Sequence, residues 1–341
     1  MSSSISVNVG KVELKSPLIL ASGTCNFGHE LSEYYDLSIL GGLSSKGLTI
    51  KPRVGNEGVR VAETAAGMLN SVGLQNPGVD YFIENDLDYM NSLGCGRIIN
   101  VAGHSFDDYV AMIEKLDPHK DKIDALEINL SCPNVKAGCM SIGSDPEQIK
   151  LIVSALRERT DLPLWIKLTP NVTDIKTMAL AAQEGGADAV VLINTLLGMA
   201  IDIRTRRPLL HNNTGGLSGP CVKPVALRMV HDIFDAVKIS VIGCGGISTY
   251  EDVLEFMIAG ASAVELGTIS LVHPTRPVEI VDALAQYCKD NGIDKKIEYY
   301  NKLSKKELMM LNNNDHRVAE VRNPESEVDA KLLLNYFKTT D

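Results

Sequence analysis

The sequence predicts an α/β fold in which eight parallel strands, each followed by a helix, close into a (β/α)8 barrel. Three observations indicate this fold. Short apolar segments alternate with amphipathic ones, most apolar segments lack a polar face and so suit a parallel sheet covered on both sides, and the alternation repeats eight times. Because periodicity cannot show that a sheet closes, a doubly wound open sheet is the alternative.

The expected strands lie at residues 18–22, 42–46, 98–102, 125–130, 164–168, 189–194, 240–243 and 263–266. The expected helices lie near 28–38, 78–93, 105–116, 146–159, 174–185, 222–236, 250–259 and 276–289. Two helix starts carry specific signals. Pro146 follows Asp145 at a first helical position, and Thr249 with Asp252 resembles a capping box.

Segments outside this repeat complete the expected organisation. Residues 4–15 suit a hairpin that caps the bottom of the barrel, and the stretches 49–78 and 196–221 are longer than ordinary connections. Active sites are usually built on such loops, at the carboxyl ends of barrel strands. We therefore expect residues 1–290 to form one catalytic domain. Residues 291–341 form a C-terminal extension of unknown role, which could pack on the barrel, mediate assembly or be partly disordered.

Composition narrows the class of protein. The chain has 341 residues, 45% of them hydrophobic, with a net charge of −10 and scattered basic residues, so neither a nucleic acid nor an anionic membrane is an expected partner. The start lacks the features of a signal peptide, and no apolar run reaches the length of a membrane span. Seven cysteines without a CxxC pair predict reduced thiols in a cytoplasmic protein, with no zinc or iron–sulfur site in this chain.

The loop after the fourth expected strand brings carboxamide side chains and a thiol close together in the sequence. Asn129, Cys132 and Asn134 lie within six residues, where the apolar segment 125–130 runs into the loop. The two carboxamides can each donate to and accept from a planar polar ring, and the thiol can exchange a proton near neutral pH. These residues suit the removal of a proton from a small heterocycle. An ordinary turn with a half-buried cysteine is the alternative.

Two glycine-rich turns follow the last two strands, at 243–247 and at 267–268. They favour a phosphate site, although a tight strand-to-helix turn would look the same. Lys46 and Lys167 stand in expected strands, where a charged residue needs a partner or must extend to the rim. Together with a phosphate site they suggest an anionic, electron-accepting ligand such as an isoalloxazine ring. Five asparagines at the same expected face also favour a polar ligand: Asn70, Asn100, Asn129, Asn134 and Asn194.

These residues resemble those of the dihydroorotate dehydrogenases, specifically the class 1B catalytic subunits, over residues 5–290. The similarity rests on an ordered series of motifs: Ala21-Ser22-Gly23-Thr24, Lys46-Gly47, Gly67-Met68-Leu69-Asn70, Gly73-Leu74-Gln75-Asn76-Pro77-Gly78, Asn100-Val101-Ala102-Gly103, the run from Asn129 to Lys136, the run from Lys167 to Val172, the run from Asn194 to Asp202, the run from Thr214 to Pro220, and Gly245-Gly246-Ile247. The resemblance implies an FMN-containing barrel that oxidises (S)-dihydroorotate to orotate in pyrimidine synthesis.

The resemblance also implies roles for individual residues. Cys132 would be the general base. Orotate would contact Lys46, Asn70, Ser71, Val72, Gly73, Leu74, Asn129, Asn134, Asn194 and Thr195. FMN would contact Ser22, Lys46, Gly47, Asn100, Asn129, Lys167, Ile193, Gly219, Gly245, Gly246, Gly267 and Thr268. Members of class 1B pass electrons to NAD through a second subunit that carries FAD and a [2Fe–2S] cluster, and we also expect a homodimer.

One departure and several alternatives accompany this interpretation. Cys139 stands where the family commonly has a second glycine, which adds bulk to the loop that carries Cys132. The same barrel could use fumarate as acceptor, or act on another dihydropyrimidine. It could also have lost catalysis and serve in an assembly, or be a phosphate-binding lyase without flavin. The intact cysteine, lysine and asparagine set favours the dehydrogenase.

Overall fold

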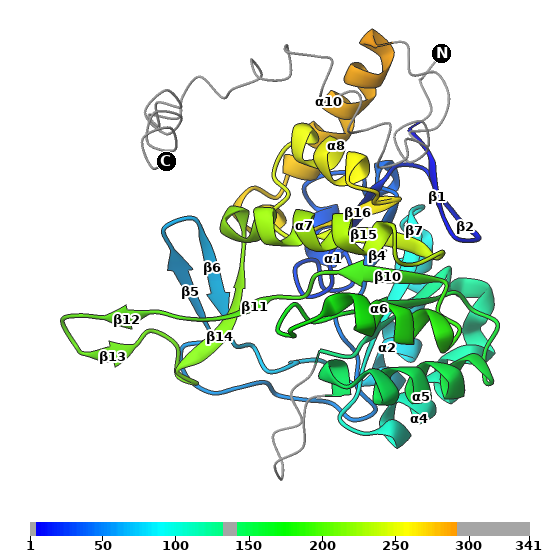
Figure 1. The fold of residues 1–341 in the computed structure, drawn as a ribbon, viewed down its shortest axis with the longest axis horizontal. Helices are drawn as coiled ribbons and strands as arrows, with labels where there is room; N and C mark the ends of the chain where they lie inside the picture. Colours follow the sequence, from blue (N-terminus) through cyan, green and yellow to red (C-terminus); the bar gives the residue numbers. More distant parts are fainter. Residues whose placement is uncertain (1–4, 132–141, 292–341) are drawn as a thin grey trace, which may run out of the picture. The chain divides into compact units, whose positions relative to one another are not determined.

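The centre of the molecule is a closed barrel of eight parallel strands (Figure 1). This computed structural model describes residues 5–131 and 142–291, all within one compact unit. The strands follow one another around the barrel in the order β10-β15-β16-β3-β4-β7-β8-β9. They are β3 (Leu18–Leu20), β4 (Gly42–Ser44), β7 (Gly96–Ala102), β8 (Ala125–Asn129), β9 (Leu164–Lys167), β10 (Ala189–Leu192), β15 (Ser240–Cys244) and β16 (Ala263–Leu266). All eight expected strands are present, and closure removes the open-sheet alternative.

Burial explains why the barrel strands look apolar throughout. Every residue of β4, β9, β10 and β16 is buried, because one face meets the barrel interior and the other meets the helices. Trp165 in β9 is a fully buried side chain of this layer. The same layer holds three charged residues, Glu127, Lys167 and Glu265. These charges are the exception to the apolar pattern.

Most expected helices are confirmed: α4 (Phe106–Leu116), α5 (Pro146–Arg157), α6 (Ile175–Glu184), α7 (Lys223–Phe234), α8 (Tyr250–Ile258) and α10 (Arg276–Asp290). Their start signals are confirmed too. The Asp145 carboxylate accepts hydrogen bonds from the N–H groups of Glu147 and Gln148, and Thr249 with Asp252 forms a reciprocal capping box.

Two expected helices are broken or short. The segment 78–93 forms α2 (Val79–Asn85) and α3 (Leu87–Ser92), separated at Asp86, whose φ of −118° interrupts the helix and whose carboxylate bonds His29 at 2.9 Å. The segment 28–38 forms only α1 (His29–Ser32) and the start of a 3₁₀ turn (Leu37–Ile39). Asp36 begins that turn by accepting from the N–H of Ser38, a local bond that competes with a continuous helix.

The N-terminal hairpin is confirmed as β1 (Val7–Val9) paired with β2 (Val12–Leu14). The two long stretches contain strands that the sequence analysis did not predict. They form an antiparallel sheet in the order β11-β14-β6-β5, made of β11 (Leu196–Met199), β14 (Thr214–Ser218), β6 (Gly67–Asn70) and β5 (Val61–Thr64). A small hairpin, β12 (Ile201–Asp202) with β13 (Arg207–Pro208), extends from this sheet (Figure 1).

Shorter elements complete the connections: α9 (Thr268–Val272) and the 3₁₀ turns Asp117–Lys122, Ile142–Ser144 and Pro220–Val222. Within the described ranges, no helix combines the length and apolar character needed to cross a bilayer.

Candidate active site

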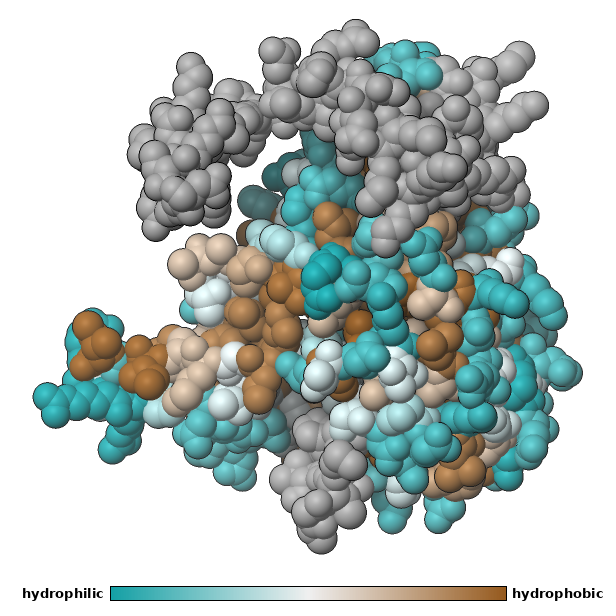
Figure 2. Space-filling view, in the orientation of Figure 1, coloured by the Kyte–Doolittle hydropathy of each residue, from teal (hydrophilic) through white to brown (hydrophobic). Residues whose placement is uncertain are grey.

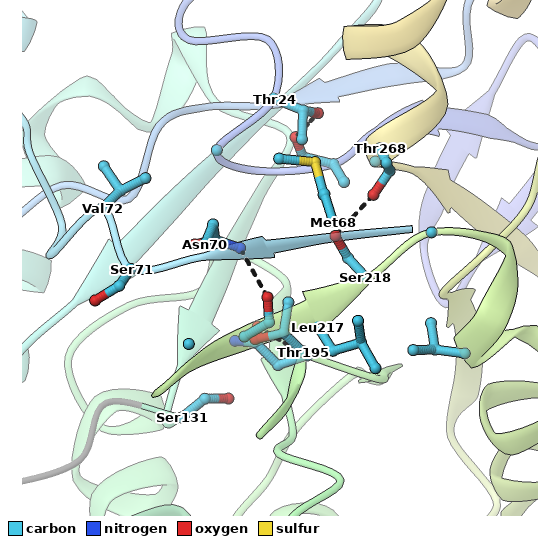
Figure 3. A pocket seen from close by; sticks show the side chains of 18 of the residues that line it. Thr24, Met68, Asn70, Ser71, Val72, Ser131, Thr195, Leu217, Ser218 and Thr268 are labelled. Carbon is cyan, nitrogen blue, oxygen red and sulfur yellow. Dashed lines mark hydrogen bonds between the residues drawn. The ribbon is translucent and has the colours of Figure 1, made fainter. Parts of the chain in front are cut away.

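A cavity of about 1900 Å³ opens where the barrel strands end and the antiparallel sheet begins. Pockets for a single small ligand usually measure about 300–1,000 Å³, so this one has room for two ring systems. Its walls come from segments far apart in the sequence. Figure 3 shows Asn70 at the end of β6, followed by Ser71, opposite Thr195 and the β14 residues Leu217 and Ser218, with Thr24 and Thr268 further along the wall.

The cavity gathers every predicted site residue that the structure describes. These are Ser22, Lys46, Gly47, Asn70, Ser71, Val72, Gly73, Leu74, Asn100, Asn129, Lys167, Ile193, Asn194, Thr195, Gly219, Gly245, Gly246, Gly267 and Thr268. Cys132, Asn134 and Cys139 lie outside the described residues. Ser131, the last described residue before that gap, lines the cavity.

Three asparagines line one part of the cavity. Asn194 donates from Nδ2 to Oδ1 of Asn129 at 3.3 Å, which orients both carboxamides. Asn129 Oδ1 also accepts from the N–H of Ser131 at 3.1 Å. Asn70 reaches the same cavity from the antiparallel sheet and donates to the carbonyl of Gly216 at 3.4 Å (Figure 3). Oriented amides of this kind recognise the donors and acceptors of a planar ring.

Lys46 supplies a positive charge to the cavity. Its Nζ lies over Gly23, where an added Cβ would be 3.9 Å away. Among the described residues, no carboxylate lies within ion-pair distance of this ammonium group. Burial lowers the pKa of Lys46, and Arg60 contributes in the same direction. A partly buried cation without an acidic partner suits an anionic ligand, because burying an unpaired charge is costly.

Glycine turns form another wall. Gly245 and Gly246 have φ values of +137° and +75°, and a Cβ at Gly246 would come within 2.8 Å of the Gly219 carbonyl. Within the described chain, the N–H groups of Gly245 and Gly246 have no hydrogen-bond acceptor. Thr268 adds a hydroxyl, bonded to Ser218 Oγ at 2.8 Å. Free N–H groups on a glycine turn suit an anionic phosphate.

Lys167 does not extend to the rim, so that alternative is wrong. Its ammonium group is buried between two carboxylates, 2.6 Å from Glu265 Oε2 and 3.2 Å from Glu127 Oε1. Burial alone would lower the pKa of Lys167, but attraction to Glu127 and Glu265 holds it well above its ordinary value. Lys167 therefore carries a permanent positive charge that reaches the cavity wall.

The two carboxyl groups respond in opposite directions. Burial raises the pKa of Glu127, but Lys167 and several hydrogen bonds outweigh it and the net shift is downward. Burial and the neighbouring charge of Glu127 raise the pKa of Glu265 well above its ordinary value, although Lys167 opposes this.

Asn100 has an orphaned acceptor beside the cavity. Its Nδ2 donates to Glu127, whereas its buried Oδ1 has no described partner. Gly47 lies next to it, and a Cβ there would come within 2.9 Å of that oxygen. Because Gly47 has no side chain, the space beside this oxygen is left open on the cavity side. A buried amide oxygen without a partner fits the N–H group of a bound ring.

Sequence reasoning missed several residues of this site. Glu127 and Glu265 are charged residues in apolar strands, the signal that identified Lys167, and could have been found in the same way. Arg53 and His104 also line the cavity, and Arg53 donates to His104 Nε2 at 2.5 Å. No sequence signal pointed to this pair, because the two residues are brought together from different loops.

The chain is similar to known proteins along most of its described length. A family model described as dihydroorotate dehydrogenase matches residues 4–287. A protein of Thermoanaerobacter sp. (strain X514) is 51% identical over 290 residues, which is 85% of this chain and 95% of that protein. A protein of Parabacteroides distasonis is 50% identical over 288 residues, 84% of this chain and 94% of that one. Both are named dihydroorotate dehydrogenase B (NAD(+)), catalytic subunit.

The fold also has a counterpart among solved structures. The crystal structure of the dihydroorotate dehydrogenase of Eimeria tenella, in complex with ferulenol, aligns with a TM-score of 0.71 over 87% of each chain, at 24% identity. At this identity the likeness concerns the fold alone.

Proposed function

This chain belongs to the dihydroorotate dehydrogenase family, and we propose that it oxidises (S)-dihydroorotate to orotate in pyrimidine biosynthesis, as the catalytic subunit of a class 1B, NAD-linked enzyme. The observation that carries this proposal is that two sets of groups share one cavity. Glycine N–H groups and the cation Lys167 suit a flavin, whereas Lys46 and the asparagines suit an anionic pyrimidine ring.

The residues present fit FMN. The N–H groups of Gly245 and Gly246 would hold its phosphate, with Thr268 beside them. Lys167 would place its charge near the electron-accepting edge of the ring, and the orphaned Asn100 Oδ1 would accept a ring N–H. Ser22, Gly47, Ile193, Gly219 and Gly267 would complete the contacts. Bound FMN would supply the hydride acceptor for the reaction.

The chain's own residues would bind the substrate and move the proton. Lys46 would pair with the substrate carboxylate, and the asparagine pair Asn129 and Asn194 would orient the ring. Residues 70–74 and Thr195 would close the pocket around it. Cys132 would remove the proton, since a thiol near a cation has an accessible thiolate. Asn134 would act from the same segment.

We propose two assemblies as well: a homodimer, and a complex with a subunit that carries FAD and a [2Fe–2S] cluster and reduces NAD. The printed name of the relatives, a catalytic subunit of an NAD(+) enzyme, supports a separate electron-transfer subunit. A strip of exposed apolar side chains on β11, on β12 and in the turn after β12 supports a protein contact: Leu197, Met199, Ile201 and Ile203. Figure 2 shows apolar side chains gathered on the protruding hairpin.

We also propose a cytoplasmic location and a catalytic domain formed by residues 1–290, followed by an extension at 291–341. The described cysteines 25, 95, 221, 244 and 288 are all free thiols, which supports a reducing compartment.

Absorption spectroscopy tests the proposal directly. The purified chain is expected to show the visible bands of an oxidised flavin, and anaerobic dihydroorotate is expected to bleach them. Bands that persist with dihydroorotate would point to another dihydropyrimidine as substrate. A colourless chain that cannot be reconstituted with FMN would refute the flavoenzyme. Comparing NAD with fumarate as oxidant of the reduced protein, with and without the proposed partner, would then identify the acceptor.

A further inference from the structure

A second arrangement lies beneath the cavity floor, inside the barrel. Glu127 from β8 and Glu265 from β16 have no exposed side-chain surface, and both contact Lys167 from β9. In the barrel registers, Glu127 pairs with Asn100 and Glu265 pairs with Cys244. Two buried carboxyl groups therefore share one buried ammonium group.

Hydrogen bonds are distributed unequally between these carboxyl groups. Oε1 of Glu127 accepts from Ser44 Oγ at 3.0 Å, from Asn100 Nδ2 and from Lys167 Nζ at 3.2 Å. Glu265 Oε2 accepts from Lys167 at 2.6 Å. The other oxygen of each group, Glu127 Oε2 and Glu265 Oε1, is buried and has no donor among the described residues. Both carboxyl groups contact the same Lys167 Nζ, so they lie close to each other.

Charge makes the doubly ionised form unfavourable. Two carboxylates in contact repel strongly in a site of low dielectric constant, and the usual resolution is that one retains its proton. The groups that face them from the other strands do not offset a second negative charge. Ser44 and Asn100 do not titrate. Burial raises the pKa values of the Cys25 and Cys244 thiols, so both are neutral at neutral pH.

We propose that Glu127 and Glu265 hold a single proton between them, so that with Lys167 they form a neutral acid–carboxylate–ammonium cluster. The unequal hydrogen bonding assigns the negative charge to Glu127, which accepts three donors, and the acid to Glu265. A proton on Glu265 also supplies a hydrogen-bond donor where the two orphaned oxygens have none.

The consequence for the cavity rests on the proposed function. Lys167 would place its positive charge nearest the flavin edge. The net charge of the three groups together would be zero, because ionised Glu127 balances Lys167 and Glu265 is neutral. Glu265 is then a positioning residue, because it acts on the cavity only through Lys167. An ionised Glu265 would instead place a net negative charge beneath the ring and make the ring harder to reduce.

Infrared spectroscopy of the flavin-free protein tests the shared proton independently of any catalytic function. The difference between wild type and Glu265→Gln at neutral pH is expected to show the loss of the C=O stretch of one protonated carboxylic acid, which shifts in D2O. Glu13→Gln, at the exposed position of β2, is the matched control and is expected to remove an ionised carboxylate stretch. If Glu265→Gln also removes a carboxylate stretch and no acid band exists, the proposal is wrong.

A second variant covers the case in which Glu265→Gln does not fold. Glu127→Gln is expected to abolish the same acid band, because Glu265 then ionises to pair with Lys167. The double variant leaves Lys167 without a counter-ion and is expected to melt at a lower temperature than either single variant, beyond the sum of their effects. Persistence of the acid band in folded Glu127→Gln would overturn the sharing of one proton.

The flavin-loaded protein provides the readout at the site. Because Gln matches the neutral acid in charge and shape, Glu265→Gln is expected to leave the reduction potential of bound flavin unchanged. A rise in the potential would show that a negative charge had been removed and would contradict the proposal. If the chain binds no flavin, the proposed function fails while the infrared result stands.

Discussion

Lys46 is a described cation of the cavity with no acidic partner, and its environment has a consequence that can be measured. Burial lowers its pKa below the ordinary value of 10.5. Only the ammonium form attracts an anion, so we expect orotate affinity to be constant near neutral pH. It should fall as the pH rises through that lowered pKa. Titration with orotate at several pH values, followed by the change in flavin absorbance, would measure this alkaline fall in affinity (the alkaline limb of the pH profile).

Two substitutions separate charge from shape at this position. Lys46→Met is expected to weaken orotate binding by about 1.5–3 kcal/mol at neutral pH, the usual worth of a hydrogen bond to a charged group. Lys46→Arg stays protonated and should lose the alkaline limb. An alkaline limb that survives in Lys46→Arg would assign the titration to another group.

Cys132 is the residue on which the proposed proton transfer depends. Replacing it by Ala is expected to leave FMN bound, because no cofactor contact is proposed for its thiol. Flavin reduction by dihydroorotate should slow by at least about a hundredfold, the usual scale of losing a general base. Stopped-flow absorbance under anaerobic conditions gives the rate. Near wild-type reduction would remove Cys132 from this role.

At the scale of elements, the start of α8 directly follows the glycine turn at Gly245 and Gly246. Thr249 caps this helix through the N–H of Asp252, and Asp252 returns the bond to the N–H of Thr249. Thr249→Ala is expected to lower the free energy of unfolding by about 1 kcal/mol, the typical value of an N-cap. Thr249→Ser keeps the hydroxyl and serves as the control. Urea denaturation of the flavin-free protein measures the free energy of unfolding of both variants. If Thr249→Ala is as stable as Thr249→Ser, the hydroxyl of Thr249 does not act as the helix cap.

In the antiparallel sheet, the backbone of β14 at Gly216 packs closely against the side chain of Thr195, a residue of the cavity wall. A Cβ at Gly216 in β14 would lie 2.1 Å from Thr195 Oγ1. Gly216→Ala is therefore expected to displace Thr195 and weaken orotate binding at least about tenfold, or about 1.4 kcal/mol, while FMN stays bound. In β11, Gly198→Ala meets the end of the flexible Leu69 side chain at 3.0 Å and is the milder comparison. Orotate titration of both variants decides whether the sheet positions Thr195.

At the scale of the whole molecule, the exposed apolar strip on β11 and β12 is the expected contact surface. Ile203 is 86% exposed and Ile201 is 56% exposed, so charges introduced there should not affect folding. Ile201→Glu with Ile203→Glu is expected to reduce the proposed dimer to monomers, or to lose the partner subunit, with an unchanged flavin spectrum. Light scattering after size exclusion measures the mass. Leu151→Glu, at an exposed position of α5, controls for added charge. An unaffected assembly in the double variant would place the interface elsewhere.

The sequence by itself determined the repeating architecture and most of the site. Eight apolar segments identified the barrel strands, because burial on both faces leaves a local signature. The polar residues at their carboxyl ends had to meet, because parallel strands bring those ends to one edge. Motifs such as Asn129 to Lys136 carried the family resemblance, which the relatives confirm.

Only the tertiary structure showed the antiparallel sheet beside the cavity and the cluster of charged residues inside the barrel. The sheet containing β6 and β14 pairs Asn70 with Gly216, residues nearly half the chain apart, and its glycine-rich strands have no local hydrophobic period. The buried charges show the same limit. Glu127, Lys167 and Glu265 are the charged residues of otherwise apolar strands. Pairing of β8 with β9 brings Glu127 to Lys167, and closure of the barrel brings Glu265 from β16 to the same ammonium group. Local patterns report burial, whereas contacts between distant segments depend on the three-dimensional path of the chain.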